Sequence, residues 1–498
     1  VASAAGVMPA FGLGARPEHL GGKAGVTAPN PVPMEGSVVG EMPPLVAPPS
    51  GEEWVAKLVA HVATMNERHA NVLMGGKNRI MRRKVSKLKE FEPLYEFYAA
   101  RELEMMYVNT LIQTGWREVR GEKKAIYRDH LNAWLKHKDC RTYLEGVKFE
   151  PHPHGTANPC GEGQFNLWAG FDVEPCAGDW SLLDHHIHNV MCEANPELYE
   201  YVMNWMAYKI QNPAKLPKAA LVCRGKKGSG KGTLGHFLRK VFGEHGLHVT
   251  NGEHFIGKFN AHLAEKVFLF ADEAFFSNDK KHEGVLKALI TDETMMVERK
   301  GLDAEQQTNY MAVFMSTNED WAVPATEDER RYCVLDVSSK YLKDESYFVP
   351  LYAQLDKPET TAAFLHTMLN RDVKGWNPSK IPETKGLQDQ RLHSLDSVGK
   401  WLVDSLSNGG FGLSADQYEI RGWTETVRAK LLIASYSDYC KEHSVSTYDR
   451  KTDTAVGIAL GKVFGKRHHT RDGNVYTLGT LEQAAQTVKD FYKLGDVF

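Results

Sequence analysis

The chain has 498 residues, of which 42% are apolar and 25% are charged, and its formal net charge is −3. A chain of this length exceeds what one hydrophobic core supports, so we expect about two to four domains. The nearly neutral charge excludes a uniformly basic nucleic-acid coat, so any nucleic-acid binding must use local basic patches.

The cysteines and the start of the chain bear on its location. Seven cysteines occur, none of them in a Cys-x-x-Cys pair, which is typical of reduced thiols in a cytosol-like compartment. No apolar run reaches transmembrane length, and no signal-peptide pattern follows Val1. We therefore expect a fragment of a longer polypeptide in the cytoplasm, or in the host cytoplasm if the protein is viral. Residues 1–50 are rich in Gly, Ala and Pro, which predicts a disordered linker.

Residues 51–205 are expected to form a mixed helical N-terminal domain. Apolar periodicity predicts helices over 52–66, 91–114, 128–136 and 196–210, and a Gly-Gly turn predicts a hairpin over 70–81. A basic cluster overlaps the hairpin and could contact DNA phosphates or form a solvated face. Its members are Lys77, Arg79, Arg82, Arg83, Lys84, Lys87 and Lys89.

A group of histidines and a cysteine follows a loop-rich segment over 150–180. His185, His188 and Cys192 could share one helical face and hold a metal ion. Structural zinc sites usually have ligand pairs at regular spacing, and none is present here. We interpret these side chains as helix-surface and packing residues, with a metal site as the alternative.

The most specific motif is Gly-Lys-Lys-Gly-Ser-Gly-Lys-Gly-Thr at 225–233. An apolar run at 219–223 predicts a strand before it, and helical spacing follows over 234–242. This is the layout of a phosphate-binding loop, in which backbone N–H groups, a helix N-terminus and a lysine bind a triphosphate. A glycine-rich turn without a ligand is the alternative. The expected ATP-binding residues are Gly225, Gly228, Ser229, Gly230, Lys231, Gly232 and Thr233.

One position of this loop departs from the usual pattern. Ser or Thr normally follows the lysine directly and contacts Mg²⁺, but here Gly232 follows and Thr233 comes next. Either Thr233 contacts phosphate while a water completes the metal shell, or the metal uses other ligands. Thr233 is kept as a candidate metal ligand.

Two further apolar runs end in polar side chains. The run 267–271 is followed by Asp272 and Glu273, which predicts a buried parallel strand with two carboxylates at its ligand-binding end. We expect Asp272 to hold Mg²⁺ directly or through water, and Glu273 to polarise the attacking water. The run 311–315 leads to Asn318, which could hydrogen-bond the γ-phosphate or the water, although Ser-Thr-Asn also makes ordinary turns.

Basic residues lie between and after these runs. A helix over 285–290 and an extended segment over 294–298 precede a turn with Arg299 and Lys300, whose hairpin could grip a DNA phosphate or lie plainly on the surface. Arg330 and Arg331 precede an apolar run at 333–337. They are surface charges or, in a ring ATPase, one is an arginine finger that reaches a neighbour's nucleotide.

The C-terminal region, 371–498, begins with a predicted connector over 378–390. Helical patterns cover 398–406, 426–442 and 455–464, and a basic strand pair then turns at Asp-Gly-Asn. This order is typical of a winged helix, whose wing would contact DNA or be purely structural. The residues expected to contact DNA phosphates are Lys462, Lys466, Arg467 and Arg471.

The order of these motifs resembles superfamily 3 helicases, and most of all the phage- and poxvirus-type primase-helicases. The supporting stretches are 165–171 (FNLWAGF), 178–180 (GDW), 222–226 (VCRGK) and 318–324 (NEDWAVP). The resemblance covers roughly residues 60–480 and implies an α/β fold with an AAA+-like P-loop ATPase core. The implied domains are the linker 1–50, the N-terminal domain 51–205, the ATPase domain 206–370, and the connector with a winged-helix-like domain 371–498.

The resemblance also implies a function. Such proteins are hexameric rings that hydrolyse ATP with Mg²⁺ between subunits and translocate on single-stranded or forked DNA, often downstream of a primase or primase-polymerase domain. The matching residues are the loop Lys231, the acids Asp272 and Glu273, the sensor Asn318, the finger Arg331 in preference to Arg330, and the hairpin Lys300. Two alternatives stay open: an ATP-binding DNA initiator or assembly scaffold that does not unwind, and a small-molecule nucleotide kinase.

Overall fold

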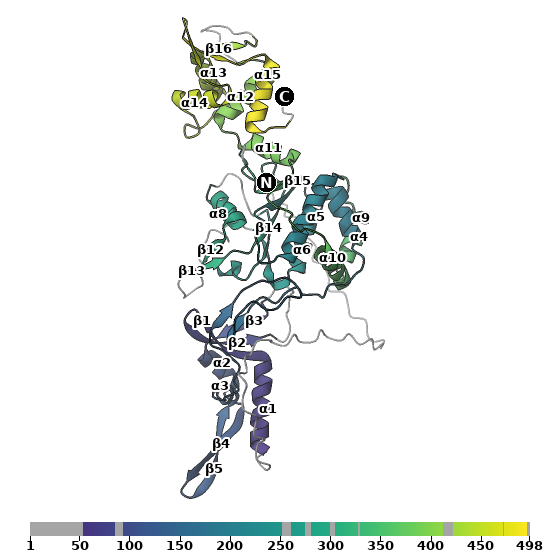
Figure 1. Ribbon diagram of the computed structural model, residues 1–498, viewed down its shortest axis with the longest axis vertical. Helices are drawn as coiled ribbons and strands as arrows, with labels where there is room; N and C mark the ends of the chain where they lie inside the picture. Colours follow the sequence, from purple (N-terminus) through teal and green to yellow (C-terminus); the bar gives the residue numbers. More distant parts are fainter. Residues whose placement is uncertain are drawn as a thin grey trace, which may run out of the picture.

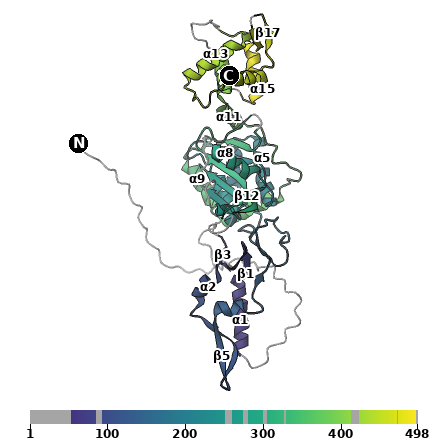
Figure 2. The same cartoon turned by 90° about the vertical axis from the view of Figure 1, so that its left-hand side faces the viewer.

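The computed structural model describes residues 53–84, 93–250, 260–273, 280–298, 304–326, 329–411, 422–471 and 473–495. An N-terminal part, a central part with a sheet and a C-terminal part follow one another along the long axis (Figures 1 and 2). The linker expected over 1–50 lies outside the described residues. Among the helices that the structure describes, none is both long and apolar enough to cross a membrane.

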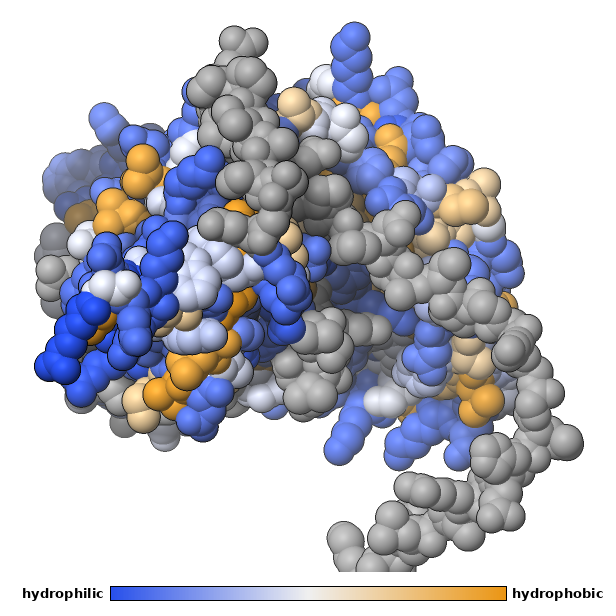
Figure 3. Space-filling view, turned by 90° about the horizontal axis from the view of Figure 1, so that it is seen from below, coloured by the Kyte–Doolittle hydropathy of each residue, from blue (hydrophilic) through white to orange (hydrophobic). Residues whose placement is uncertain are grey.

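The N-terminal part combines helices with a four-stranded sheet of order β3-β2-β1-β6 and a separate β4–β5 hairpin. Its elements are α1 (Glu53–Arg68), β1 (His69–Met74), β2 (Lys77–Arg83), β3 (Tyr95–Tyr98), α2 (Ala100–Tyr107), β4 (Leu111–Val119), β5 (Glu122–Asp129), α3 (His130–Leu135) and β6 (Thr142–Tyr143). The helices predicted over 52–66 and 128–136 and the hairpin over 70–81 are confirmed. Seen from below (Figure 3), the visible face is mostly hydrophilic, with hydrophobic side chains in small groups.

The single helix predicted over 91–114 is wrong. Only α2 is helical there, because its sequence, AREL followed by EMMY, consists mostly of strong helix formers. The aromatic sequence of β3 favours an extended chain and pairs with β2, with Ile80 opposite Tyr98. Thr110 lies between α2 and β4, and β4 pairs with β5 in the hairpin that extends below α1 in Figure 1.

A connecting segment leads to the central part through β7 (Gly146–Lys148), β8 (Gln164–Asn166), α4 (Ser181–His185), a π-helix η1 (His186–Met191) and α5 (Pro196–Gln211). The predicted helix over 196–210 is confirmed. It starts where the side chain of Asn195 accepts a hydrogen bond from the Leu198 N–H, with Pro196 in the first turn. Most of α5 is buried in the same core as the central sheet, so the boundary expected between 205 and 206 falls inside this helix.

The central part is built on five parallel strands of order β10-β11-β14-β9-β15. The strands are β9 (Ala220–Arg224), β10 (Gly246–Val249), β11 (Phe268–Asp272), β14 (Ala312–Thr317) and β15 (Tyr332–Asp336). The strand predictions at 219–223, 267–271, 311–315 and 333–337 are confirmed. Their continuous apolar runs suit strands that are buried on both faces.

Helices cover both faces of this sheet (Figure 1). Alternate strand residues face opposite sides, so Phe270 of β11 packs in one core and Leu269 in the other. The first core contains residues of α5, α6 (Thr233–Val241), α9 (Glu345–Leu355) and α10 (Pro358–Asn370), and the second contains residues of α8 (Lys280–Thr291). The result is an α/β fold with a parallel sheet between helical layers.

Three smaller sheets complete the described chain, one of them the parallel pair β7–β8. β12 (Thr294–Val297) pairs antiparallel with β13 (Glu305–Thr308), which confirms the predicted extended segment over 294–298. The C-terminal part contains a three-stranded sheet of order β16-β18-β17. Its elements are α12 (Ser397–Ser407), β16 (Thr426–Arg428), α13 (Ala429–Glu442), α14 (Asp453–Val463), β17 (His468–Thr470), β18 (Gly473–Thr477) and α15 (Leu481–Tyr492).

Three features of the C-terminal half differ from expectation. The helix predicted over 426–442 begins only at Ala429, because residues 426–428 form β16, which pairs with β18. The predicted connector over 378–390 is partly helical, because α11 (Lys385–Ser394) begins after Thr384, whose side chain accepts a hydrogen bond from the Leu387 N–H. The helix α15 was missed, although Thr480 and Gln483 form a reciprocal capping box at its start. The Thr-x-x-Gln sequence of this capping box is therefore a pattern from which the start of α15 can be predicted.

The close approach of α6 to the sheet yields a prediction. A Cβ built on Gly235 would lie 2.6 Å from ring carbons of the fully buried Phe270, whereas one on Gly284 of α8 meets nothing within 4 Å. We expect Gly235→Ala to lower the free energy of unfolding by about 1–3 kcal/mol through overpacking. Gly284→Ala, the control, should be neutral or stabilise by up to about 1 kcal/mol. Denaturant unfolding checks both, and equal effects would contradict the tight α6–β11 contact.

Candidate functional site

The phosphate-binding loop predicted at 225–233 joins β9 to α6. Gly228 and Gly230 have φ values of +88° and +87°, a region that other residues rarely adopt. A Cβ on Gly230 would also lie 2.6 Å from Cε1 of His186. The loop therefore needs glycine at both positions for its backbone path, and at the second for its contact with η1.

The structure brings together three residues predicted from separate segments. Lys231 Nζ donates a hydrogen bond of 2.5 Å to Asn318 Oδ1 and lies 3.6 Å from Glu273 Oε1. The Asn318 side-chain amide donates to the same Glu273 oxygen at 2.5 Å, and the Asn318 backbone N–H donates to Oε2 at 3.1 Å. A cation, an acid and an amide thus meet where β9, β11 and β14 end.

Glu273 is held in an unusual backbone conformation. Its φ is +55°, in the left-handed region, which costs a residue with a Cβ about 1–2 kcal/mol. Its backbone N–H donates to Ser316 O at 2.9 Å, and its carboxylate also accepts a hydrogen bond from the hydroxyl of Thr317 at 3.3 Å. The surrounding bonds therefore fix a strained acid at the edge of the sheet, a pattern often found at functional positions.

A cavity of about 660 Å³ opens in front of these residues. This volume lies within the range of ligand pockets, about 300–1,000 Å³. The cavity is lined by loop and strand-end residues, and by residues of α6, of α9 and the residue that follows α9. The residues of the first group are Lys227, Gly228, Gly230, Lys231, Gly232, Thr233, Asp272, Glu273 and Asn318. The residues of the second group are His236, Phe237, Lys240, Tyr352, Leu355 and Asp356.

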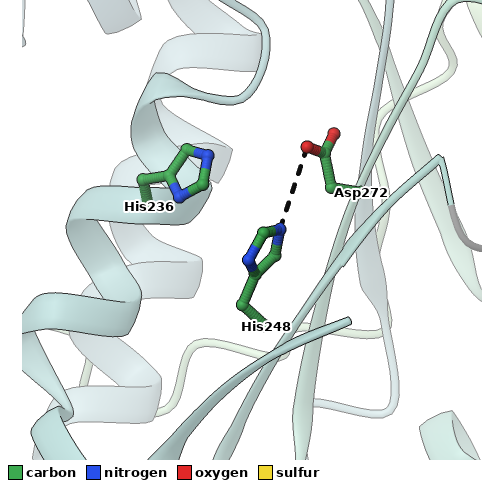
Figure 4. Close-up of side chains that lie close together, drawn as sticks. All are labelled: His236, His248 and Asp272. Carbon is green, nitrogen blue, oxygen red and sulfur yellow. Dashed lines mark ion pairs between the residues drawn. The ribbon is translucent and has the colours of Figure 1, made fainter. Parts of the chain in front are cut away.

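Asp272 ends β11 beside the loop. The imidazole of His248, with a smaller effect from the Ser316 hydroxyl that donates to Oδ1, holds the pKa of Asp272 below its usual value. His248 Nε2 lies 3.8 Å from Asp272 Oδ2, and His236 completes the group (Figure 4). Asp272 is therefore an ionised carboxylate able to bind a cation.

The hydroxyl-bearing residues of the loop have different surroundings. The Thr233 hydroxyl lies 3.4 Å from the hydroxyl of Tyr352 on α9, within hydrogen-bond distance. The Ser229 hydroxyl is buried and makes no hydrogen bond with any residue that the structure describes. Gly225, the first loop residue, donates its N–H to Thr317 O at 3.2 Å, which joins the loop to the end of β14.

His186 supports the loop from behind, a role that no sequence motif indicated. Burial lowers its pKa to about 4, so the ring is neutral. Its Nε2 is 3.1 Å from the Gly230 carbonyl, which can only accept, so Nε2 carries the hydrogen and the Tyr347 hydroxyl donates to Nδ1 at 3.0 Å. The alternative metal site of His185, His188 and Cys192 does not form. Within the described ranges, the group of side chains that could hold a metal ion is His236, His248 and Asp272.

The predicted arginines lie away from the cavity. They precede β15, whose first residue pairs with Ala220 at the start of β9, so about 16 Å of strand separates them from the loop. Arg331 Nη1 is 3.2 Å from Glu329 Oε1, and the Glu329 side chain is only 1% exposed. Arg330 is exposed and makes no side-chain hydrogen bond or ion pair within the described part of the chain. Neither arginine reaches the site of its own chain.

The predicted DNA contacts are spread over the molecule. Arg299 and Lys300 lie outside the described residues, between β12 and β13. Lys462, near the end of α14, and Lys466, Arg467 and Arg471, around β17, are all exposed. In the N-terminal cluster, Arg82 pairs with Glu96 at 3.0 Å and Lys84 with the same acid at 3.7 Å, which gives these two a structural role.

Known proteins share parts of this sequence. Residues 223–331, from the end of β9 to Arg331, match the model of a "family of unknown function (DUF5906)". A DNA primase-polymerase of Nitratiruptor phage NrS-1 is 28% identical over 215 residues, which are 41% of this chain and 30% of the phage protein. The chain is therefore homologous to a part of a phage primase-polymerase, and the match spans less than a third of that protein.

Solved structures show the same fold over more of the chain. The apo structure of the NrS-1 C-terminal region has a TM-score of 0.59 at 17% identity and covers 86% of this chain and 100% of that one. An A-form apo structure of the same region has a TM-score of 0.57 at 17% identity and covers 83% and 96%. The likeness establishes a shared fold.

The buried His186 gives a pH prediction. Its pKa of about 4 lies below the usual value of about 6.5, so the unfolded chain binds this proton more readily than the folded one. The stability that neutral His186 contributes is therefore complete above about pH 6.5 and is lost as the pH falls towards about 4. The ring-¹³C resonance of His186 can be assigned because it disappears in His186→Gln. We expect its chemical shift to remain that of a neutral imidazole down to about pH 5. A midpoint near that of free histidine would contradict the burial.

Proposed function

We propose that this chain is an ATP-driven DNA helicase of the superfamily 3 type, which translocates on single-stranded or forked DNA as a hexameric ring. The observation that carries this proposal is the meeting of Lys231, Glu273 and Asn318 at the phosphate end of the cavity. Homology to a part of a phage primase-polymerase supports a role in phage DNA replication. It also motivates the proposal that a primase or primase-polymerase domain lies upstream in the full-length protein.

The first step of the proposed mechanism is binding of the ATP phosphates at the loop between β9 and α6. Backbone N–H groups at the start of α6 and the ammonium of Lys231 would hold the phosphates. Lys231 donates a hydrogen bond to Asn318 and forms an ion pair with Glu273, and phosphate oxygens would replace one of these two partners. Lys227 and Lys240 line the same cavity and add positive charge for a triphosphate.

The second step is attack of water on the γ-phosphate. Glu273 would act as the general base, and the Asn318 amide, which already donates to Glu273 Oε1 at 2.5 Å, would keep the carboxylate aligned. Asp272 fits a Mg²⁺ ligand because it is ionised and lies beside the loop. The ion, when bound, would neutralise charge on the phosphates. Thr233 remains a candidate for a second contact.

The motor parts are proposed from the family resemblance and from their places in the fold. The β12–β13 hairpin, with Arg299 and Lys300 between its strands, would reach DNA in the centre of the ring. The C-terminal part, with α13, α14 and the β17–β18 pair, would act as a winged-helix-like domain whose exposed Lys466, Arg467 and Arg471 contact phosphates. The AAA+-like core would close each nucleotide site with an arginine from the next subunit.

ATP hydrolysis with and without single-stranded DNA tests this function. We expect DNA to stimulate turnover, Glu273→Gln to lower the rate by about 10²–10⁴-fold because the base is lost, and Lys231→Ala to abolish DNA-stimulated turnover because the phosphates lose their cation. Lys226→Ala is the matched control, because Lys226 belongs to the same loop and does not line the cavity.

The alternatives make different predictions in the same assay. DNA-independent hydrolysis without unwinding would favour an initiator or scaffold, and phosphate transfer to an added nucleoside monophosphate would favour a kinase. A wild-type rate of turnover in Glu273→Gln would contradict the assignment of Glu273 as the general base. If no oligomeric state of the protein hydrolysed ATP, the proposal of an ATP-driven motor would be overturned.

A complementation experiment distinguishes the roles of Arg330 and Arg331. Arg331 pairs with the buried Glu329, so Arg331→Ala should lower the free energy of unfolding by about 1–3 kcal/mol. Because Arg331 is held by Glu329, we place the arginine finger at Arg330 instead of at Arg331, which the family resemblance favoured. Arg330 is exposed, so Arg330→Ala should reduce turnover by about 10³-fold or more at unchanged stability. Mixing Arg330→Ala with Lys231→Ala subunits should restore part of the turnover, since some interfaces then combine an intact lysine with an intact arginine. No recovery on mixing would contradict action across the interface.

A further inference from the structure

Three potential metal ligands converge beside the loop. His236 lies on α6, His248 on β10 and Asp272 at the end of β11, and one ligand atom of each lies within 4.8 Å of the others (Figure 4). These elements are joined through the sheet, because β10 and β11 pair in parallel with His248 opposite Phe270. The grouping is therefore fixed by the core of the fold.

One aromatic ring positions both imidazoles. The His248 ring stacks on Phe270 at 4.8 Å with an interplanar angle of 16°. The His236 ring meets the same Phe270 edge-on at 4.9 Å and 82°. Phe270 is fully buried, and the Ser316 hydroxyl fixes the third ligand by donating to Asp272 Oδ1. Supporting contacts of this kind orient metal ligands before the ion binds.

An unsatisfied nitrogen points to a missing ligand. His248 Nε2 is buried and makes no hydrogen bond with any described residue; it faces Asp272 Oδ2 at 3.8 Å, in the ion pair drawn in Figure 4, which is too long for a hydrogen bond. Ligand atoms at about 2.0–2.1 Å from a tetrahedral ion would lie about 3.3 Å apart. A shift of roughly half an ångström therefore brings the nitrogen and the oxygen onto one ion. An ion there would satisfy the buried nitrogen.

Gly232 lies beside the same group of residues. A Cβ at this position, where the usual loop has Ser or Thr, would lie 3.8 Å from His236 Cδ2 and 3.8 Å from Ser316 Oγ. The space that a hydroxyl side chain would enter is thus bordered by the His236 ring, which follows one helical turn later. Imidazole suits transition metals, whereas Mg²⁺ prefers oxygen ligands.

We propose that His236, His248 and Asp272 bind a divalent transition-metal ion, of the Mn²⁺, Co²⁺ or Zn²⁺ class, at the phosphate end of the cavity. Two imidazoles and one carboxylate leave coordination positions open, as in sites where an ion also binds water or substrate. His236 and Asp272 line the cavity, so the open positions face the place proposed for the phosphates. The site shares Asp272 with the Mg²⁺ position of the proposed ATP hydrolysis and so builds on that proposal, but its ion binding is tested without nucleotide.

Titration of the metal-free full chain with Co²⁺, without nucleotide, tests the site. Visible absorption of the bound ion reports imidazole coordination, and calorimetry with Zn²⁺ gives the stoichiometry. We expect one ion per chain, and at least about 10-fold weaker binding in His236→Ala and in His248→Ala. His393→Ala is the matched control, since His393 is an exposed histidine at the end of α11 and should leave the binding unchanged.

The His236→Ala variant decides whether these three residues hold the ion. His236 is exposed on α6, so His236→Ala should keep its fold, which circular dichroism checks, and its result decides even if His248→Ala unfolds. Equal binding in wild type and folded His236→Ala, binding that His393→Ala weakens as much, or no saturable binding would each overturn the site. Equal competition by Mg²⁺ would overturn its preference for transition metals. Hydrolysis is measured separately, so neither proposal falls with the other.

Discussion

The parallel pairing of β14 with β9 on one side and β11 on the other is the constraint on which the site depends. It aligns the carboxyl ends of these strands, so Asp272 lies opposite Ser316, and Thr317 opposite Arg224. Three polar segments that are 40 or more residues apart in sequence then meet around Lys231. A slip of one residue in β14 would turn its polar end to the other face and separate the amide from the acid.

The loop is held by contacts from elements outside the sheet. Neutral His186 of η1 donates to the Gly230 carbonyl, and Tyr347 of α9 in turn donates to His186. At the other end, Arg224 forms charge-assisted bonds with Asp336 of β15 and Asp389 of α11. A glycine-rich loop alone has high conformational entropy, so such contacts keep its shape before a ligand binds.

The sequence predicted the elements whose signals are local and failed where tertiary contacts decide. Continuous apolar runs predicted β9, β11, β14 and β15. Their polar ends predicted Asp272, Glu273 and Asn318, and the glycine-rich motif predicted Lys231; the structure brings Lys231, Glu273 and Asn318 together. Periodicity could not separate β3 and β4 from a helix, because pairing with β2 and β5 decides their conformation. His186, His236 and His248 carry no short motif, since their roles follow from packing between α6, β10 and η1.

The histidine group also changes how the departure at Gly232 is understood. A loop without a hydroxyl directly after the lysine lacks the usual oxygen ligand, so a metal beside the phosphates would need another protein ligand in its place. The donors within reach of Asp272 are two imidazole nitrogens braced by Phe270, one of them buried without a hydrogen bond among the described residues. Gly235, which lets α6 approach Phe270, also brings His236 to this place. Gly232, in the loop, and Gly235, at the helix–sheet contact, therefore lie beside the same small volume. The imidazole nitrogens there favour a transition-metal ion over Mg²⁺ in the proposed site.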